Sequence, residues 1–249
     1  MTNTLHRYSE HYAIHPRPEP PPVDDDFIVF AMATRGVNDD DLVEKYRTFA
    51  RLALAHDPVN LGNASKGGLY RPEPALTPLA HWRREARPNP DRLLTEIDGP
   101  TTMAAVFRRR QDMDGFVRDL AAADLGVSIN VSAPVDAAAA CCAAAGLARH
   151  SVEYSVGFEG RLERLPERTV LEISTMCGHG MIAHTLVRKL LDWVKEARRT
   201  PADAARYLCR FCTCGVFNPA RAETLFARAR ADRPERGSSA GDGSASRAS

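Results

Sequence analysis

The sequence predicts a layered α/β (or α+β) domain, in which helices cover a mixed sheet and a helical, cysteine-rich subregion forms the C-terminal part. Three observations favour this class. Short apolar runs typical of buried strands alternate with segments of helical periodicity. Signals for helix starts recur near the C-terminus, and all six cysteines of the 249-residue chain follow residue 140. Alternating strands and helices are typical of a layered fold.

The two ends of the chain differ in composition from the middle. Residues 1–24 include five prolines between Pro16 and Pro22, which remove backbone donors and favour extended geometry. Residues 232–249 are dominated by Gly, Ser, Ala, Asp and Arg and contain no large apolar side chain. We therefore expect a disordered tail at each end and a single metal-binding domain at residues 25–231.

The first half of this domain opens with a strand and a helix. The apolar run Phe27–Met32 predicts a buried strand, and Asn38 is the expected N-cap of the helix that follows. Residues 57–100 are rich in Pro, Gly and Asn, which indicates a surface segment with short helical stretches at 79–85 and 91–97.

The next elements continue the alternation. After Gly99-Pro100 the pattern predicts a helical region at 101–124, interrupted at Gly115. It then predicts strands at 127–131, 151–158 and 169–173 and an alanine-rich helix at 134–147.

Three helices are expected in the C-terminal part. The first follows residues 176–180 and carries an apolar face made of Val187, Leu190, Leu191 and Val194. Thr200-Pro201 and Asn218-Pro219 each combine an N-cap residue with a proline at the first helical position, so two further helices should start there.

The overall charge limits the classes of partner that the chain is expected to bind. With 33 Lys+Arg against 32 Asp+Glu, the net charge of +1 argues against broad capture of nucleic acid, and the arginine runs at 83–87 and 108–110 are interpreted as solvated helix faces. No apolar run reaches the roughly 20 residues of a membrane span, and no secretion signal is visible. We expect a cytoplasmic protein that acts on a small molecule, without membrane or nucleic-acid partners; the pattern leaves the oligomeric state open.

The segment Gly62–Gly68 contains one candidate substrate site. Its glycines, with Ser65 and Lys66, offer backbone amides, a hydroxyl and an ammonium to an anion, although the spacing is not that of a phosphate-binding Walker loop. The simpler interpretation, which the composition favours, is a flexible, turn-rich loop. The functional hypothesis for this segment is that Ser65 and Lys66 hold a substrate carboxylate.

The cysteines carry the main functional hypothesis. Cys177-Gly178-His179-Gly180 is followed about thirty residues later by a group of three cysteines, Cys209, Cys212 and Cys214, and then by a glycine. In a reducing compartment, clustered cysteines are typical of metal ligands. We predict that Cys177, Cys212 and Cys214 bind a metal, either as three ligands or with Cys209 as a fourth. The adjacent Cys141 and Cys142 point in different directions on a helix and are interpreted as packing residues.

The irregular spacing leaves the metal open between a [4Fe–4S] cluster, which we prefer, and Zn²⁺. With three thiolates, one iron would stay open and bind a substrate oxygen or sulfur, and His179 and His184 are the candidate acid/base groups. This predicts a metal-dependent lyase or hydrolase that adds or eliminates water or sulfide. The alternatives are a zinc-stapled structural or partner-binding protein, a one-electron carrier, and a Cys177 nucleophile activated by His179.

Overall fold

The computed structural model describes residues 26–71, 87–152 and 160–232. A five-stranded sheet lies at its centre, with strand order β3-β2-β4-β1-β5 and every neighbouring pair antiparallel. The strands are β1 (Phe27–Met32), β2 (Asn60–Asn63), β3 (Gly67–Gly68), β4 (Thr102–Phe107) and β5 (Ser128–Ser132). The predicted layered α/β class is confirmed, but the expected mixed pairing is wrong.

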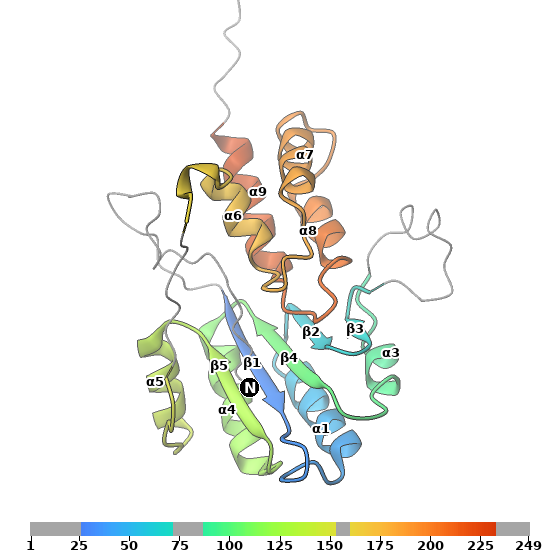
Figure 1. Ribbon diagram of the computed structural model, residues 1–249, viewed down its shortest axis with the longest axis vertical. Coiled ribbons are helices and arrows are strands. Elements are labelled where there is room, and N and C mark those ends of the chain that lie inside the picture. Colours follow the sequence, from blue (N-terminus) through green and yellow to red (C-terminus); the bar gives the residue numbers. More distant parts are fainter. Residues whose placement is uncertain (1–25, 72–86, 153–159, 233–249) are drawn as a thin grey trace, which may run out of the picture.

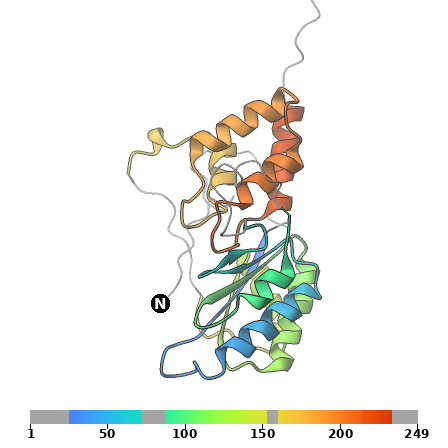
Figure 2. The same cartoon turned by 90° about the vertical axis from the view of Figure 1, so that its right-hand side faces the viewer.

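The helices divide into two groups on opposite sides of the sheet (Figures 1 and 2). The first group consists of α1 (Leu42–Leu54), α3 (Pro90–Thr95), α4 (Arg110–Ala123) and α5 (Val135–Ala144). The second group, beyond a short 3-10 turn at Leu162–Arg164, consists of α6 (Arg168–Ser174), α7 (His184–Lys195), α8 (Pro201–Cys209) and α9 (Pro219–Ala231).

Alternation along the central strands explains the two cores. Successive residues of a strand point to opposite faces, and in β1 the side chains of Phe27 and Val29 pack with α1 and α4, whereas those of Ile28 and Phe30 pack with α6–α9. Because both faces are covered, the central strands are apolar at nearly every position. With β3 and the short helix α3 set aside, the elements β1, α1, β2, β4, α4 and β5 have the β-α-β-β-α-β order of the split β-α-β arrangement, which is a topology and implies no function.

Residues 101–124 correct one prediction. The first part of the expected helix is strand β4, which is buried on both faces and therefore lacks the alternation that marks a half-exposed strand. The second part, α4, runs through Gly115 without interruption. A Cβ at Gly115 would lie 2.8 Å from Cε1 of His56, so a side chain there would have to displace this imidazole, which contacts Asp119 at 2.7 Å.

The expected strand at 169–173 is also wrong, because these residues form α6. All residues from Val170 to Ser174 are buried, including Glu172, which is paired with Arg168 at 2.7 Å, and a run this short does not distinguish a strand from a helix. Of the expected strand at 151–158, only residues 151 and 152 are described, and they belong to no regular element.

The first helix starts later than predicted. Asp41 occupies the N-cap position of α1, and Asn38 instead accepts a hydrogen bond from the Thr34 amide and donates one to the Gly126 carbonyl. The segment 57–100 was expected to wrap the surface; it includes β2 and β3, which are buried members of the sheet. Its expected helix at 91–97 corresponds to α3, and the stretch at 79–85 lies outside the described residues.

The C-terminal signals are confirmed. Thr200 caps α8 by accepting a hydrogen bond from the Asp203 amide, and Asn218 caps α9 by accepting one from the Arg221 amide. The four apolar residues predicted for the face of α7 are all buried. The two predicted tails lie outside the described residues except for Asp232. In the described ranges, no helix is long and apolar enough to cross a membrane.

Candidate metal centre

The first part of the site is a turn that follows α6. The amide of Gly180 donates to the carbonyl of Cys177 at 2.9 Å, which closes the segment Cys177-Gly178-His179-Gly180. Gly180 has φ +67°, a left-handed conformation that glycine adopts at little cost. The turn buries the thiol of Cys177 and exposes the imidazole of His179.

The second part is a matching turn that follows α8. The amide of Gly215 donates to the carbonyl of Cys212 at 3.2 Å, and Gly215 has φ +69°. In both turns a donor side chain stands at the first and third positions and a left-handed glycine at the fourth. The sequence Cys-x-Cys-Gly therefore repeats the geometry of Cys-x-His-Gly, and the two turns together supply three thiols and one imidazole.

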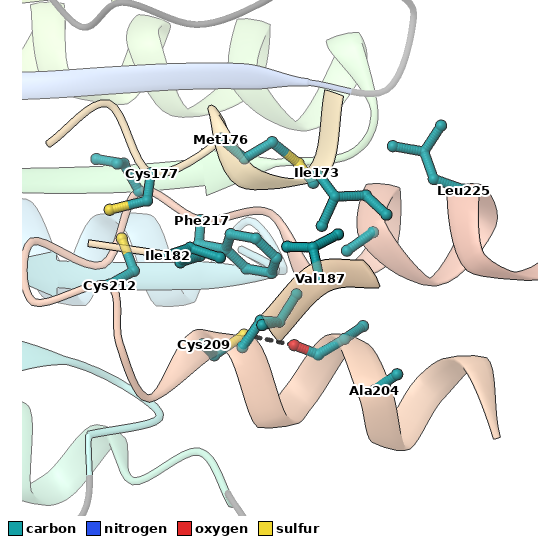
Figure 3. Packing of buried hydrophobic residues seen from close by; sticks show 14 of the residues in the cluster. Ile173, Met176, Cys177, Ile182, Val187, Ala204, Cys209, Cys212, Phe217 and Leu225 are labelled. Carbon is teal, nitrogen blue, oxygen red and sulfur yellow. Dashed lines mark hydrogen bonds between the residues drawn. The ribbon is translucent and has the colours of Figure 1, made fainter. Parts of the chain in front are cut away.

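The four donor side chains of the two turns are in contact. Cys212 Sγ lies 3.8 Å from Cys214 Sγ, and Cys214 Sγ lies 3.3 Å from Nδ1 of His179. The thiols of Cys212 and Cys177 are also hydrogen-bonded, and Figure 3 shows their sulfur atoms facing each other. The donors form a row in the order Cys177, Cys212, Cys214, His179.

The contacts lower the pKa of two of the three thiols and raise the pKa of the third. Hydrogen bonding to Cys212, aided by backbone amides, lowers the pKa of Cys177 to about 7. Hydrogen bonding to Cys212 likewise lowers the pKa of Cys214 to about 6, with further contributions from the Val216 amide and His179. The same two hydrogen bonds raise the pKa of Cys212, because they favour its protonated form. The hydrogen bonds of Cys212 therefore shift its pKa in the opposite direction from the pKa of Cys177 and of Cys214.

The second turn packs directly on strands β2 and β3 of the sheet. A Cβ on Gly62 in β2 would lie 1.8 Å from the carbonyl oxygen of Cys214, and one on Gly68 in β3 would lie 2.8 Å from the Cα of Gly215. Nearby, the side-chain amide of Asn60 donates to the Phe217 carbonyl at 2.8 Å. The glycines of the Gly62–Gly68 segment allow the cysteine turn to approach the strands, a role that the sequence pattern did not reveal.

The predicted substrate residues Ser65 and Lys66 lie in the turn between β2 and β3. The hydroxyl of Ser65 donates to the side-chain oxygen of Asn63 at 2.8 Å, and the ammonium of Lys66 lies 2.7 Å from a carboxylate oxygen of Asp98. Both groups therefore take part in contacts within the chain. Their role in holding an anion stays a prediction.

The other two predicted site residues lie apart from the row. Cys209 is the last residue of α8; its thiol donates to the carbonyl of Ala205 at 3.5 Å, and burial raises its pKa. In Figure 3 this thiol points along α8 and away from Cys177 and Cys212. His184 is the first residue of α7 and is exposed. The structure brings together Cys177, Cys212, Cys214 and His179, but not Cys209 or His184.

The row of donors is not a preformed cage. Across residues 26–71, 87–152 and 160–232, no group of three or more His, Cys, Asp or Glu side chains is arranged so that it could hold a metal ion as it stands. Enclosing an ion would require the donors to turn inward from contact with each other. His179 has room for such a movement, since it is exposed and its turn contains a glycine on either side.

Comparisons with protein-family models, with curated proteins and with solved structures found no match for this chain.

Proposed function

We propose that the protein binds one zinc ion through Cys177, His179, Cys212 and Cys214, and that the ion staples the C-terminal helices to each other and to the sheet. The observation that carries this proposal is the pair of matched turns. They lie far apart in the chain, on either side of α7 and α8, yet their four donor side chains are in contact.

The contact distances favour one ion over a cluster. Two thiolates on a tetrahedral zinc, each with a Zn–S bond of about 2.3 Å, lie roughly 3.8 Å apart. Cys212 Sγ and Cys214 Sγ are separated by 3.8 Å. In a [4Fe–4S] cluster each cysteine binds a different iron, so the sulfur atoms are spread around the cluster. Thiols in direct contact do not leave that space, and the geometry therefore favours Zn²⁺ over the [4Fe–4S] cofactor expected from the sequence.

The surroundings favour a structural role. Structural zinc sites are closed by four protein ligands, whereas catalytic sites keep one position for water or substrate. Here four donors are available, three of them buried, and the loop after the second turn is joined to β2 through Asn60. An ion at this position would connect the end of α6, the end of α8 and the sheet.

One observation favours the enzymatic alternative. His179 is the exposed member of the row, so an ion held by the three thiols alone would keep a position open on that side. Such a centre suits the lyase or hydrolase predicted from the sequence, with an open metal polarising a substrate oxygen or sulfur. In that case replacement of His179 should leave the metal in place, and the change would be in turnover.

Metal analysis of purified protein and variants tests these proposals. We expect one zinc per chain, no acid-labile sulfide, and loss of zinc in Cys177→Ser, Cys212→Ser and Cys214→Ser. Cys142→Ser is the matched control and should retain the metal. His179→Ala should lower the affinity for zinc if the imidazole is a ligand of a closed site. It should leave that affinity unchanged if the three thiols alone hold the ion. Stoichiometric iron and sulfide would overturn the zinc assignment, and zinc retained in all three cysteine variants would overturn the site.

A further inference from the structure

Positive charge is concentrated in one part of the chain. Residues 184–210, which span α7 and α8, contain seven Lys+Arg and three Asp+Glu, a net charge of +4. The rest of the chain contains 26 Lys+Arg and 29 Asp+Glu, a net charge of −3. The near-neutral total therefore conceals a basic segment within an otherwise acidic protein.

The cations of this segment are arranged around two aromatic rings. Three charged groups lie over the ring of Trp193, with Lys189 Nζ 5.6 Å and the guanidinium carbons of Arg198 and Arg199 each 5.5 Å from its centroid. The guanidinium of Arg199 also lies 5.5 Å from the ring of Tyr207, and that of Arg210 lies 5.3 Å from the same ring. We call this set the cation–aromatic stack: Lys189, Trp193, Arg198, Arg199, Tyr207 and Arg210.

The stack holds like charges close together. Arg198 lies 3.3 Å from Glu196, and Arg199 is near enough to Asp203 to help lower the pKa of that carboxyl. Among the described residues, no carboxylate lies within ion-pair distance of Lys189 or Arg199. The guanidinium groups of Arg199 and Arg210 lie over the same ring, that of Tyr207, so these two like charges are close together. A surface that serves solubility alone intersperses charges of both signs. The cations of the stack lie close together on two aromatic rings, so a partner of opposite charge would be attracted to this surface.

The chemistry of the stack selects among anionic partners. Three of its four cations are arginines, whose planar guanidinium binds phosphate through two hydrogen bonds and stacks on flat rings. Guanidinium planes and aromatic rings are also the surfaces on which unpaired bases stack. A carboxylate-rich protein would use the charge but not the stacking. We propose that the cation–aromatic stack binds single-stranded nucleic acid, with the guanidinium groups on the phosphates and the bases against the stacked planes.

This proposal revises the expectation that nucleic acid is not a partner. The total charge of +1 averages over the basic residues 184–210, and the arginine runs at 83–87 and 108–110 lie outside that segment. The proposal does not depend on the metal, because no residue of the stack is a proposed ligand. Arg210 stands two positions before Cys212, so both features share the end of α8.

Fluorescence anisotropy with a labelled oligouridylate of about 20 nucleotides tests the proposal on the full chain. If about three phosphates are contacted, binding should weaken about twentyfold when the salt rises from about 50 to about 200 mM. Arg198→Ala/Arg199→Ala should weaken binding at least tenfold at the lower salt. The matched control is Arg108→Ala/Arg118→Ala, which removes the same charge from exposed positions elsewhere and should change binding less than twofold.

A second variant tests the stacking. Tyr207→Leu keeps every charge and should weaken binding about fivefold, with circular dichroism confirming that the variant is folded. Absence of binding at about 50 mM salt would overturn the proposal. So would equal weakening by the two double variants, or tighter binding to polyglutamate or to phosphatidylserine vesicles than to the oligonucleotide. These outcomes are independent of the metal content, so failure here does not affect the zinc site.

Discussion

The carbonyl group of Cys214 lies directly over Gly62, so close that a Cβ at Gly62 would be 1.8 Å from the carbonyl oxygen. This contact joins the second cysteine turn to strand β2. Since both partners are backbone, neither can be relieved by a change of rotamer. The position of the turn on the sheet therefore depends on the absence of a side chain at residue 62.

Gly62→Ala should displace the turn and destabilise the protein by at least about 2 kcal/mol, at the upper end of overpacking costs. It should also reduce the metal content, because the displaced turn carries two of the proposed ligands. Urea unfolding and zinc analysis measure the two effects. Gly99→Ala is the control, since a Cβ at Gly99 meets nothing within 4 Å. A Gly62→Ala variant as stable as the control would show that the close packing of the Cys214 carbonyl on Gly62 is not required.

Removal of the metal should loosen the C-terminal helices more than the sheet. A structural zinc ion contributes its binding free energy to folding, so treatment with a chelator should lower the stability by several kcal/mol. Hydrogen exchange should then increase in α6–α9 and remain slow in β1 and β4. Restored protection on adding zinc, but not magnesium, is the accompanying control. Uniform loss of protection across the molecule would argue against a local staple.

The thiol contacts predict how the stability of the metal-free protein depends on pH. Folding lowers the pKa of Cys177 to about 7 and of Cys214 to about 6, from an ordinary value of 9.0. Between these values the unfolded chain binds more protons than the native one, so stability should rise with pH from 6 to 9 and be lost as the pH falls through 7 and 6. Above pH 9 the raised pKa of Cys212 has the opposite effect.

Urea unfolding at a series of pH values checks this dependence. Cys214→Ser removes one of the two thiolates and should flatten the rise in stability between pH 6 and 9. Cys142→Ser should leave the curve unchanged. An unchanged slope in Cys214→Ser would show that this thiol is not the source of the pH dependence.

Asn218 should contribute more to stability than a typical helix cap. Its side chain accepts a hydrogen bond from the Arg221 amide at the start of α9 and donates one to Asp26 at 3.0 Å. Loss of a cap costs about 1 kcal/mol, and Asn218→Ala also removes the contact with Asp26, so we expect about 2 kcal/mol. Thr200→Ala is the comparison; it removes the cap of α8 and an exposed hydrogen bond to the Asp203 carboxylate, and should cost about 1 kcal/mol. Equal costs would show that the Asp26 contact adds nothing.

The successes and failures of sequence-based prediction have physical causes. Helices α8 and α9 were predicted because a cap residue and a proline are local signals that depend on few neighbours. Strand β4 and helix α6 were assigned to the wrong class because burial on all sides removes the alternation between apolar and polar residues. Whether a fully buried segment forms a strand or a helix depends on the elements that pack against it.

Several members of the candidate site could be predicted from the sequence, but their setting could not. The spacing of the cysteines identified Cys177, Cys212 and Cys214, and the glycines on both sides of His179 singled out that residue. Two facts could not be inferred from the spacing: the thiol of Cys209 donates to the Ala205 carbonyl one turn back in α8, and Gly62 makes room for the second turn. The glycines of β2 and β3 are the available signal for the second fact, but their pattern alone indicates a flexible loop or an anion site rather than close packing of backbone.

X-ray absorption at the zinc edge of the purified full-length protein tests the central claim most directly. We predict a first shell of three sulfur atoms at about 2.3 Å and one nitrogen at about 2.0 Å, with the nitrogen lost in His179→Ala. A shell of four sulfur atoms would contradict the proposed ligand set. Absence of zinc, with an iron edge that shows neighbouring iron atoms, would contradict the single-ion site.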